Sequence, residues 1–109
     1  MNYLKDRILI TVGTGLVGTA LTKRLKDLGC NVVSCGFTRG EVQCDLTEMR
    51  FVNDLFNSVK PKIVIDLAAK VGGIYANMMG KADFYMTNTL INTNIVRAVQ
   101  ERRIPYVMA

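Results

Sequence analysis

Apolar residues along this chain follow two patterns in turn, and together they predict alternating strands and helices. Short apolar runs at 7–12, 31–35 and 62–69 are typical of buried parallel strands, because a strand covered on both faces has no polar side. In the intervening segments, apolar residues recur at the spacing of one helix face. The three predicted helix faces comprise Leu16, Val17, Ala20, Leu21, Leu25 and Leu28; Phe51, Val52, Leu55, Phe56 and Val59; and Phe84, Ile91, Ile95, Ala98 and Val99.

The order of these elements predicts an α/β fold. A strand, a helix and a second strand within the first third of the chain form a βαβ unit, which implies a parallel sheet. We therefore expect one domain over 1–109, a three-layer Rossmann-type sheet with helices on both faces and a further strand starting at Tyr106. The interval from Cys35 to Glu41 is too short for a helical crossover, so any strand at 41–45 should be rudimentary.

A few residues mark where the predicted elements end. Gly29 suits a left-handed stop to the first helix, and Pro61 is expected to end the second. Asp45 and Glu48 have the spacing of a capping box at the start of that second helix. Asp66 interrupts an apolar strand, and the sequence alone gives no reason for it.

The composition indicates a folded domain outside the membrane. Half of the 109 residues are apolar, yet no run approaches the ~20 residues that a membrane span needs. The apolar run near the amino terminus is too short for a signal peptide. We therefore expect a soluble, cytoplasmic protein with no membrane partner.

The chain carries a formal net charge of +5, with basic clusters at 23–26 and 102–103 that should lie on solvated helix faces. Aromatic residues do not interleave with these charges, so nucleic acid is not expected as a partner. An anionic small ligand such as a nucleotide suits the basic excess.

The three cysteines are Cys30, Cys35 and Cys44, they lack C-x-x-C spacing, and the chain has no histidine. This set excludes an ordinary zinc site, so no metal centre is predicted. Small, buried or half-buried free thiols in a reducing compartment are expected instead.

Three glycines lie where the first strand gives way to the first helix, as Gly13-x-Gly15-x-x-Gly18. The amino terminus of a helix offers unpaired N–H groups, and a pyrophosphate can approach them closely only where no Cβ intervenes. The motif in this strand–turn–helix context predicts a dinucleotide site at this turn. The alternative is a glycine-rich turn without a ligand.

The choice of dinucleotide depends on the residues after the second strand. An acidic residue there binds the ribose hydroxyls in NAD-dependent proteins, and this chain has none from the start of the second strand at Asn31 until Glu41. Arg39 instead suits the 2′-phosphate of NADP(H), although it is equally well read as a solvated loop arginine. Asp45 likewise has two interpretations, as a helix cap or as an adenine contact.

The segments "TVGTGLVG", "DLTE", "LAAKVGGIYAN", "ADF" and "NTLINTNIVRAV" resemble the amino-terminal part of the GDP-L-fucose synthase family. That family comprises GDP-4-keto-6-deoxymannose epimerase/reductases among the extended short-chain dehydrogenases/reductases. The resemblance covers essentially the whole chain, and it implies an NADP(H)-binding fold that acts on a GDP-sugar. It also implies that this sheet is truncated after the start of the strand that follows the long helix.

The resemblance also implies roles for individual residues. The phosphate loop would comprise Val12, Gly13, Thr14, Gly15, Leu16, Val17 and Gly18. Asp45 and Leu46 would flank the adenine, and Leu67, Ala68 and Ala69 would lie beside the cofactor. The substrate side would be bordered by Lys70, Val71, Gly72, Gly73 and Asn88.

The chain departs from the family at two points. Val12 replaces the first glycine of the family's glycine loop, which puts cofactor affinity in question because a β-branched residue resists positive φ. None of the four tyrosines has a lysine four residues on, so the family's Tyr-x-x-x-Lys pair is absent. The family's catalytic serine also lies in the part beyond this resemblance.

We therefore predict no catalytic residue in this chain and no activity for the chain alone. The predicted function is the cofactor-binding portion of a GDP-fucose synthase-like enzyme. Two alternatives stay open: a non-catalytic nucleotide- or partner-binding module, or a fragment of another nucleotide-sugar epimerase or dehydratase. Val107 and Met108 should be partly uncovered, so a complementing polypeptide or a second copy is expected as a partner.

Overall fold

The computed structural model describes residues 6–11, 16–36, 42–67 and 82–108. In chain order the elements are β1 (Arg7–Thr11), α1 (Leu16–Asp27), β2 (Asn31–Gly36), β3 (Val42–Gln43), α2 (Met49–Val59), β4 (Ile63–Asp66), α4 (Ala82–Arg102) and β5 (Tyr106–Met108). The predicted strands and helices are all present, with ends within a few residues of those expected. Among the described residues, no helix combines the length and the apolar character that crossing a bilayer requires.

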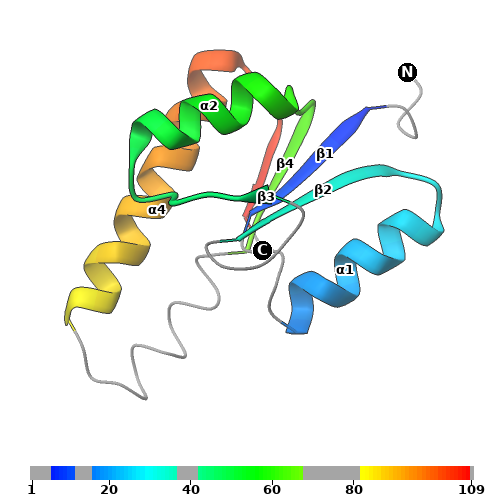
Figure 1. Cartoon of the computed structure of the whole chain (residues 1–109), viewed down its shortest axis with the longest axis horizontal. Helices are drawn as coiled ribbons and strands as arrows, with labels where there is room; N and C mark the ends of the chain where they lie inside the picture. The colour runs from blue at the N-terminus through cyan, green and yellow to red at the C-terminus, as the bar shows by residue number, and fades with distance from the viewer. Residues whose placement is uncertain (1–5, 12–15, 37–41, 68–81, 109) are drawn as a thin grey trace.

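The strands form one parallel sheet in the order β3-β2-β1-β4-β5 (Figure 1). The βαβ unit inferred from the sequence is confirmed, since β1 pairs in parallel with β2 along the whole length of β1. The rudimentary strand is confirmed as β3, which has two residues and pairs only with the end of β2. Its shortness follows from a connection that leaves no room for a crossover helix.

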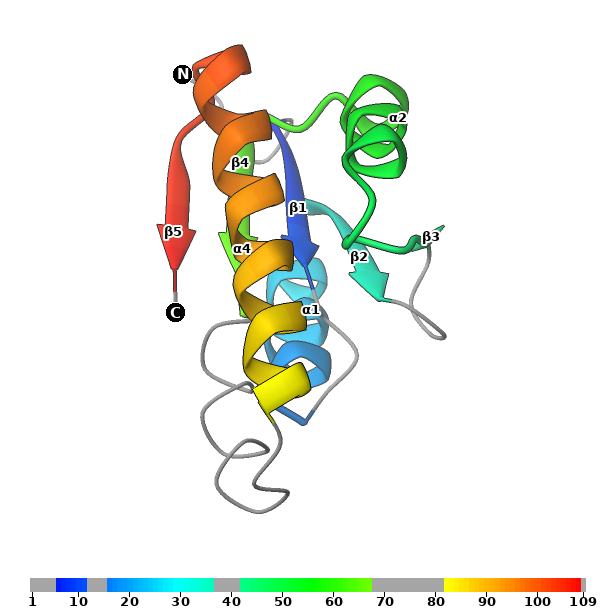
Figure 2. The ribbon, with the colours of Figure 1, turned by 90° about the vertical axis from the view of Figure 1, so that its left-hand side faces the viewer.

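Helices cover both faces of the sheet, as Figure 2 shows from the side of α4. α1 lies on one face, and α2 and α4 lie on the other. Because side chains alternate along a strand, Leu9 and Val64 enter the core beneath α2 and α4, whereas Ile8 and Ile10 face α1. The three-layer Rossmann-type architecture is therefore confirmed.

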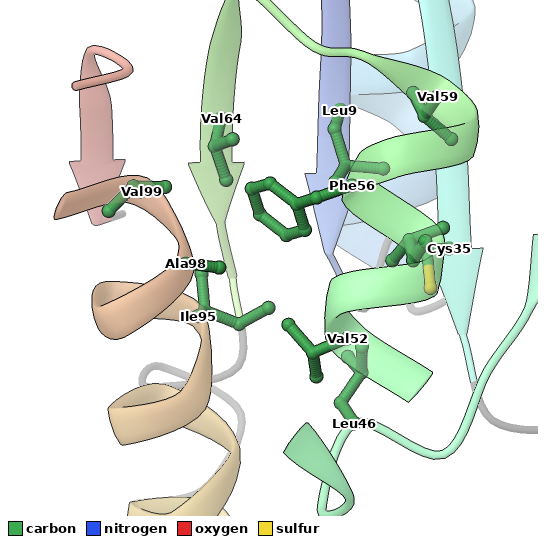
Figure 3. Close-up of a cluster of buried hydrophobic side chains, with 11 residues drawn as sticks. Leu9, Cys35, Leu46, Val52, Phe56, Val59, Val64, Ile95, Ala98 and Val99 are labelled. Carbon is green, nitrogen blue, oxygen red and sulfur yellow. The ribbon is translucent and has the colours of Figure 1, made fainter. Parts of the chain in front are cut away.

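The larger core lies between the sheet, α2 and α4 (Figure 3). Phe56 is its largest fully buried side chain, and it projects between the two helices and the strands. Four of the five residues predicted for the α2 face are buried, but the prediction for Phe51 is wrong, since it is 39% exposed. Phe51 precedes the buried stripe by one position, and the Arg50 guanidinium lies 5.0 Å from its ring centroid.

The predicted face of α1 is only partly correct. Leu21 and Leu25 pack against the sheet, but Ala20 is exposed and Leu28 is 53% exposed. Leu28 lies beyond the last helical residue, in the turn that leads from α1 into β2. Gly29 follows with a φ of 86°, which confirms the left-handed stop.

The predicted start of α2 needs correction, whereas its predicted end is confirmed. Glu48 is the N-cap residue and makes no side-chain capping hydrogen bond, so the capping box is absent. Asp45 instead organises the preceding turn, since its Oδ1 accepts hydrogen bonds from the backbone N–H and the hydroxyl of Thr47. α2 ends at Val59, and the C-cap residue Lys60, whose φ of 52° is left-handed, lies directly before Pro61, as expected of a proline that stops the helix.

The expectation that both arginines at 102–103 are solvated is wrong for Arg102. Its guanidinium donates hydrogen bonds to Asn53 and Asn57 of α2 and lies 5.3 Å from the Phe56 ring centroid. The planar guanidinium thereby links the carboxyl ends of α2 and α4. Arg103 is exposed, as predicted.

Candidate functional site

The candidate site lies outside the carboxyl ends of β1 and β4, where the direction of the chain path through the sheet reverses. From β1 the chain passes through α1 to β2 on one side, whereas β4 pairs with the other side of β1. α1 begins at this same end of the sheet (Figure 2). A switch point with a helix amino terminus aimed at it is where open parallel sheets bind anionic ligands.

The structure describes only some of the predicted site residues. Residues 12–15, Arg39 and 68–73 lie outside the described residues, so the glycine loop and most of the substrate-side loop stay predictions. Leu16 and Val17 open α1, and Gly18 is buried in its first turn. Asn88 lies in α4, but its side chain is also outside the described set.

Asp45 and Leu46 follow β3 and lead into α2. Leu46 is 3% exposed, its side chain belongs to the core, and its carbonyl accepts a 3.0 Å hydrogen bond from Asn94 Nδ2 of α4. Asp45 is half-buried, and one of its oxygens holds the turn to Thr47. The side chain and the carbonyl of Leu46 are therefore both engaged within the fold.

Leu67 directly follows β4. Its backbone N–H donates a 3.3 Å hydrogen bond to the carbonyl of Thr11, which continues the pairing of β1 and β4. Its side chain is 3% exposed and packs with Ile8 and Ile10 beneath α1. Leu67 thus fixes the point where the chain leaves the sheet toward Ala68.

A buried polar network that the sequence did not reveal ties three strands together at this edge. Thr11 ends β1 and Asp66 ends β4, and both are 0% exposed. Thr11 Oγ1 donates a 2.8 Å hydrogen bond to Asp66 Oδ1, and the Tyr106 hydroxyl at the start of β5 donates one of 2.9 Å to Oδ2. This network explains the acidic residue in an apolar strand. Its only sequence signal is a polar residue at the last position of two buried strands.

The network also raises the pKa of Tyr106. Burial, together with the hydrogen bond to Asp66 and its negative charge, raises the pKa of Tyr106 far above its ordinary value of 10.0. The phenol therefore stays protonated near neutral pH and acts as a hydrogen-bond donor. A tyrosine held in this way positions strands rather than transferring protons to a substrate.

The cysteines match the expectation of free thiols. Cys35 is buried near the end of β2, and Cys30 and Cys44 are half-buried. Burial, with smaller contributions from the adjacent Cys44, raises the pKa of the Cys35 thiol to about 12. Within the described ranges, no cluster of acidic, cysteine or histidine side chains suits a metal ion.

The buried Cys35 thiol predicts a loss of stability in alkali. The unfolded thiol titrates near 9.0 and the folded one near 12, so the unfolded chain loses its proton first as the pH rises. Over that range Cys35 should lower the free energy of unfolding by about 1.4 kcal/mol per pH unit. Denaturant unfolding at pH 9 to 11 should therefore show a shallower pH slope in Cys35→Ala. Val32→Ala, which removes buried volume from the same strand without an ionisable group, should keep the original slope.

The sequence pattern of the NAD dependent epimerase/dehydratase family matches residues 8–109. Among curated proteins, a probable GDP-L-fucose synthase of Drosophila melanogaster is 40% identical over 96 residues, which cover 88% of this chain and 30% of that protein. The GDP-L-fucose synthase of Escherichia coli is 37% identical over 100 residues, covering 92% of this chain and 30% of that enzyme. This chain thus spans about a third of the length of these relatives.

Solved structures of similar fold also match this chain over only part of their own length. A GDP-L-fucose synthetase from Naegleria fowleri bound to NADP superimposes with a TM-score of 0.74 at 30% identity, covering 99% of this chain and 32% of that one. The GDP-mannoheptose C4 reductase MlghC from Campylobacter jejuni, with NADP bound, gives a TM-score of 0.78 at 25% identity, covering 99% and 33%.

Proposed function

This chain belongs to the NAD dependent epimerase/dehydratase family, and we propose that it is the NADP(H)-binding portion of an epimerase/reductase that acts on a GDP-sugar. The observation that carries the proposal is the switch point at the carboxyl ends of β1 and β4, with α1 beginning beside it after a glycine motif. The relatives named GDP-L-fucose synthase and the NADP-bound structural neighbours support the choice of substrate class and cofactor.

The residues at the switch point fit a dinucleotide. The first turn of α1 would supply N–H groups to the pyrophosphate, and Gly13 and Gly15 would leave room for it to approach. Arg39 would pair with the 2′-phosphate and Asp45 would contact the adenine. The bound nicotinamide would supply a hydride. On the sugar side, Lys70 and its neighbours through Gly73, with Asn88, would border the substrate.

The chain's own contribution is binding and positioning. The network of Thr11, Asp66 and Tyr106 holds the ends of β1 and β4. The predicted glycine loop follows β1, and the predicted substrate-side loop follows β4. The chain contains no Tyr-x-x-x-Lys pair, so the acid–base groups for epimerisation would come from a complementing polypeptide or continuation. Val107 is 50% exposed beside the unpaired edge of the sheet, which suits such a partner. No turnover of GDP-4-keto-6-deoxymannose is expected from residues 1–109 alone.

Calorimetric titration of the chain with NADPH and NADH tests the proposal. NADPH should bind at least about tenfold more tightly, because a charge-assisted hydrogen bond to the 2′-phosphate contributes about 1.5–3 kcal/mol. Arg39→Ala should remove this preference and leave NADH binding unchanged. Arg24→Ala, at an exposed arginine on α1, should leave both affinities unchanged. Equal affinity of the unaltered chain for the two dinucleotides would contradict the role of Arg39, and binding of neither would favour a partner-binding module.

A further inference from the structure

A second concave surface lies at the amino-terminal edge of the sheet, at the opposite end from the nucleotide site. It is a groove of about 570 Å³ between the carboxyl ends of α2 and α4, lined mainly by 60–62 and 102–105. These two segments directly precede β4 and β5. Neither the glycine motif nor the family resemblance gives this surface a role.

The groove carries concentrated positive charge. Its lining includes Lys60, Lys62, Arg102 and Arg103 and contains no acidic residue. Arg102 is held by Asn53 and Asn57, and it lies 3.9 Å from a carboxylate oxygen of Glu101. In the part of the chain that the structure describes, the side chains of Lys60, Lys62 and Arg103 make no hydrogen bond or ion pair. Three cations therefore remain available to a partner.

Among the described residues, these three side chains make no hydrogen bond to the carbonyls at the ends of the two helices. Other donors already satisfy carbonyls in the last turns: the Lys60 backbone N–H bonds to the Phe56 carbonyl, and the Arg102 side chain bonds to the Ala98 carbonyl. Lys60 and Arg103 also have left-handed φ values of 52° and 54°. Glycine adopts this conformation more easily at a helix carboxyl end, so the backbone gives no reason for long cationic residues there.

We propose that this groove, formed by 60–62 and 102–105, docks an acidic peptide segment of a partner polypeptide. The free charges come from two separate chain segments and are interleaved with Pro61, Ile104 and Pro105. Carboxylates spaced along an extended peptide can contact both segments of the groove at once. Phe56, the aromatic residue of the lining, is 1% exposed, so the groove lacks the stacking surface that favours single-stranded nucleic acid.

Fluorescence anisotropy with a short, labelled, glutamate-rich peptide tests the proposal on the full chain. The peptide should bind with an affinity that falls as salt rises, and its glutamine counterpart should not bind. The triple variant Lys60→Gln, Lys62→Gln, Arg103→Gln should weaken binding by about tenfold or more. Lys23→Gln, Arg24→Gln, Arg97→Gln removes the same charge from exposed positions elsewhere and should change affinity by less than about twofold.

Glycine variants separate docking from a purely structural role. Lys60→Gly with Arg103→Gly should keep the thermal midpoint, because glycine tolerates the left-handed conformation, yet should lose peptide affinity. A large fall in the midpoint with unchanged peptide affinity would overturn the proposal. So would equal weakening by the control triple variant, or tighter binding of a short single-stranded DNA than of the peptide. Failure of NADPH binding has no bearing on these outcomes, since the groove lies at the other end of the sheet.

Discussion

Asp66→Ala should lower the free energy of unfolding by about 2–4 kcal/mol, because two hydroxyls lose a charged acceptor while buried. Thr11 Oγ1 and the Tyr106 hydroxyl both donate to this carboxylate, and Thr11 and Asp66 are 0% exposed. Against a typical stability of about 5–15 kcal/mol for a whole domain, this loss is large. Chemical denaturation of the purified chain measures it directly.

Asp66→Ala should weaken NADPH binding as well as lower the free energy of unfolding. Thr11 and Asp66 are the last residues of β1 and β4, so the predicted phosphate loop and substrate-side loop depart from the two ends that this carboxylate joins. NADPH affinity should fall as well under conditions where the variant is still folded. Asp54→Ala removes an exposed carboxylate from α2 and should change stability by less than about 0.5 kcal/mol. Equal stability of Asp66→Ala and Asp54→Ala would show that the network contributes nothing.

Tyr106→Phe tests the same network from its other side. It removes one donor and leaves the buried carboxylate with one hydrogen bond fewer, so its effect should not add to that of Asp66→Ala. In the double variant, the loss should be close to that of Asp66→Ala alone. Strict additivity would mean that the two side chains stabilise the fold independently, despite the 2.9 Å distance between their oxygens.

Phe56→Ala should have the largest effect in the chain, about 3–5 kcal/mol, because it opens a cavity at the centre of the larger core. The ring is 1% exposed and lies between α2, α4 and the sheet (Figure 3). It also supports the Arg102 guanidinium, which joins the two helices. A loss of this size leaves little stability, so thermal unfolding of the variant should begin far below that of the unaltered chain.

Phe51→Ala is the matched control in the same helix. Phe51 is 39% exposed and contacts Arg50 rather than the core, so its truncation should cost less than about 1 kcal/mol. A similar loss for both phenylalanines would mean that α2 is placed with the wrong face toward the sheet. The midpoints of thermal unfolding, measured side by side, distinguish these outcomes.

The sequence alone determined the order of elements and the parallel sheet, and it predicted a general place for a nucleotide site. Apolar runs at strand length and apolar residues at helix spacing are local signals, so they can be recognised without knowing which elements pack together. Gly29 as a left-handed stop and the rudimentary strand after Cys35 follow equally from local geometry, and both are confirmed. The roles of Arg39 and of the glycine motif are still predictions of the sequence.

Only the tertiary structure decided how polar residues are used. Asp66 and Thr11 lie 55 positions apart, so no local pattern reveals that strand pairing brings their side chains together. Arg102 contacts α2 rather than solvent because the packing of the two helices brings Asn57 within its reach. Asp45 accepts a hydrogen bond within its own turn and does not form a capping box with Glu48. Periodicity reports which face of an element is apolar, whereas the partner of a buried polar group depends on which strands and helices lie side by side.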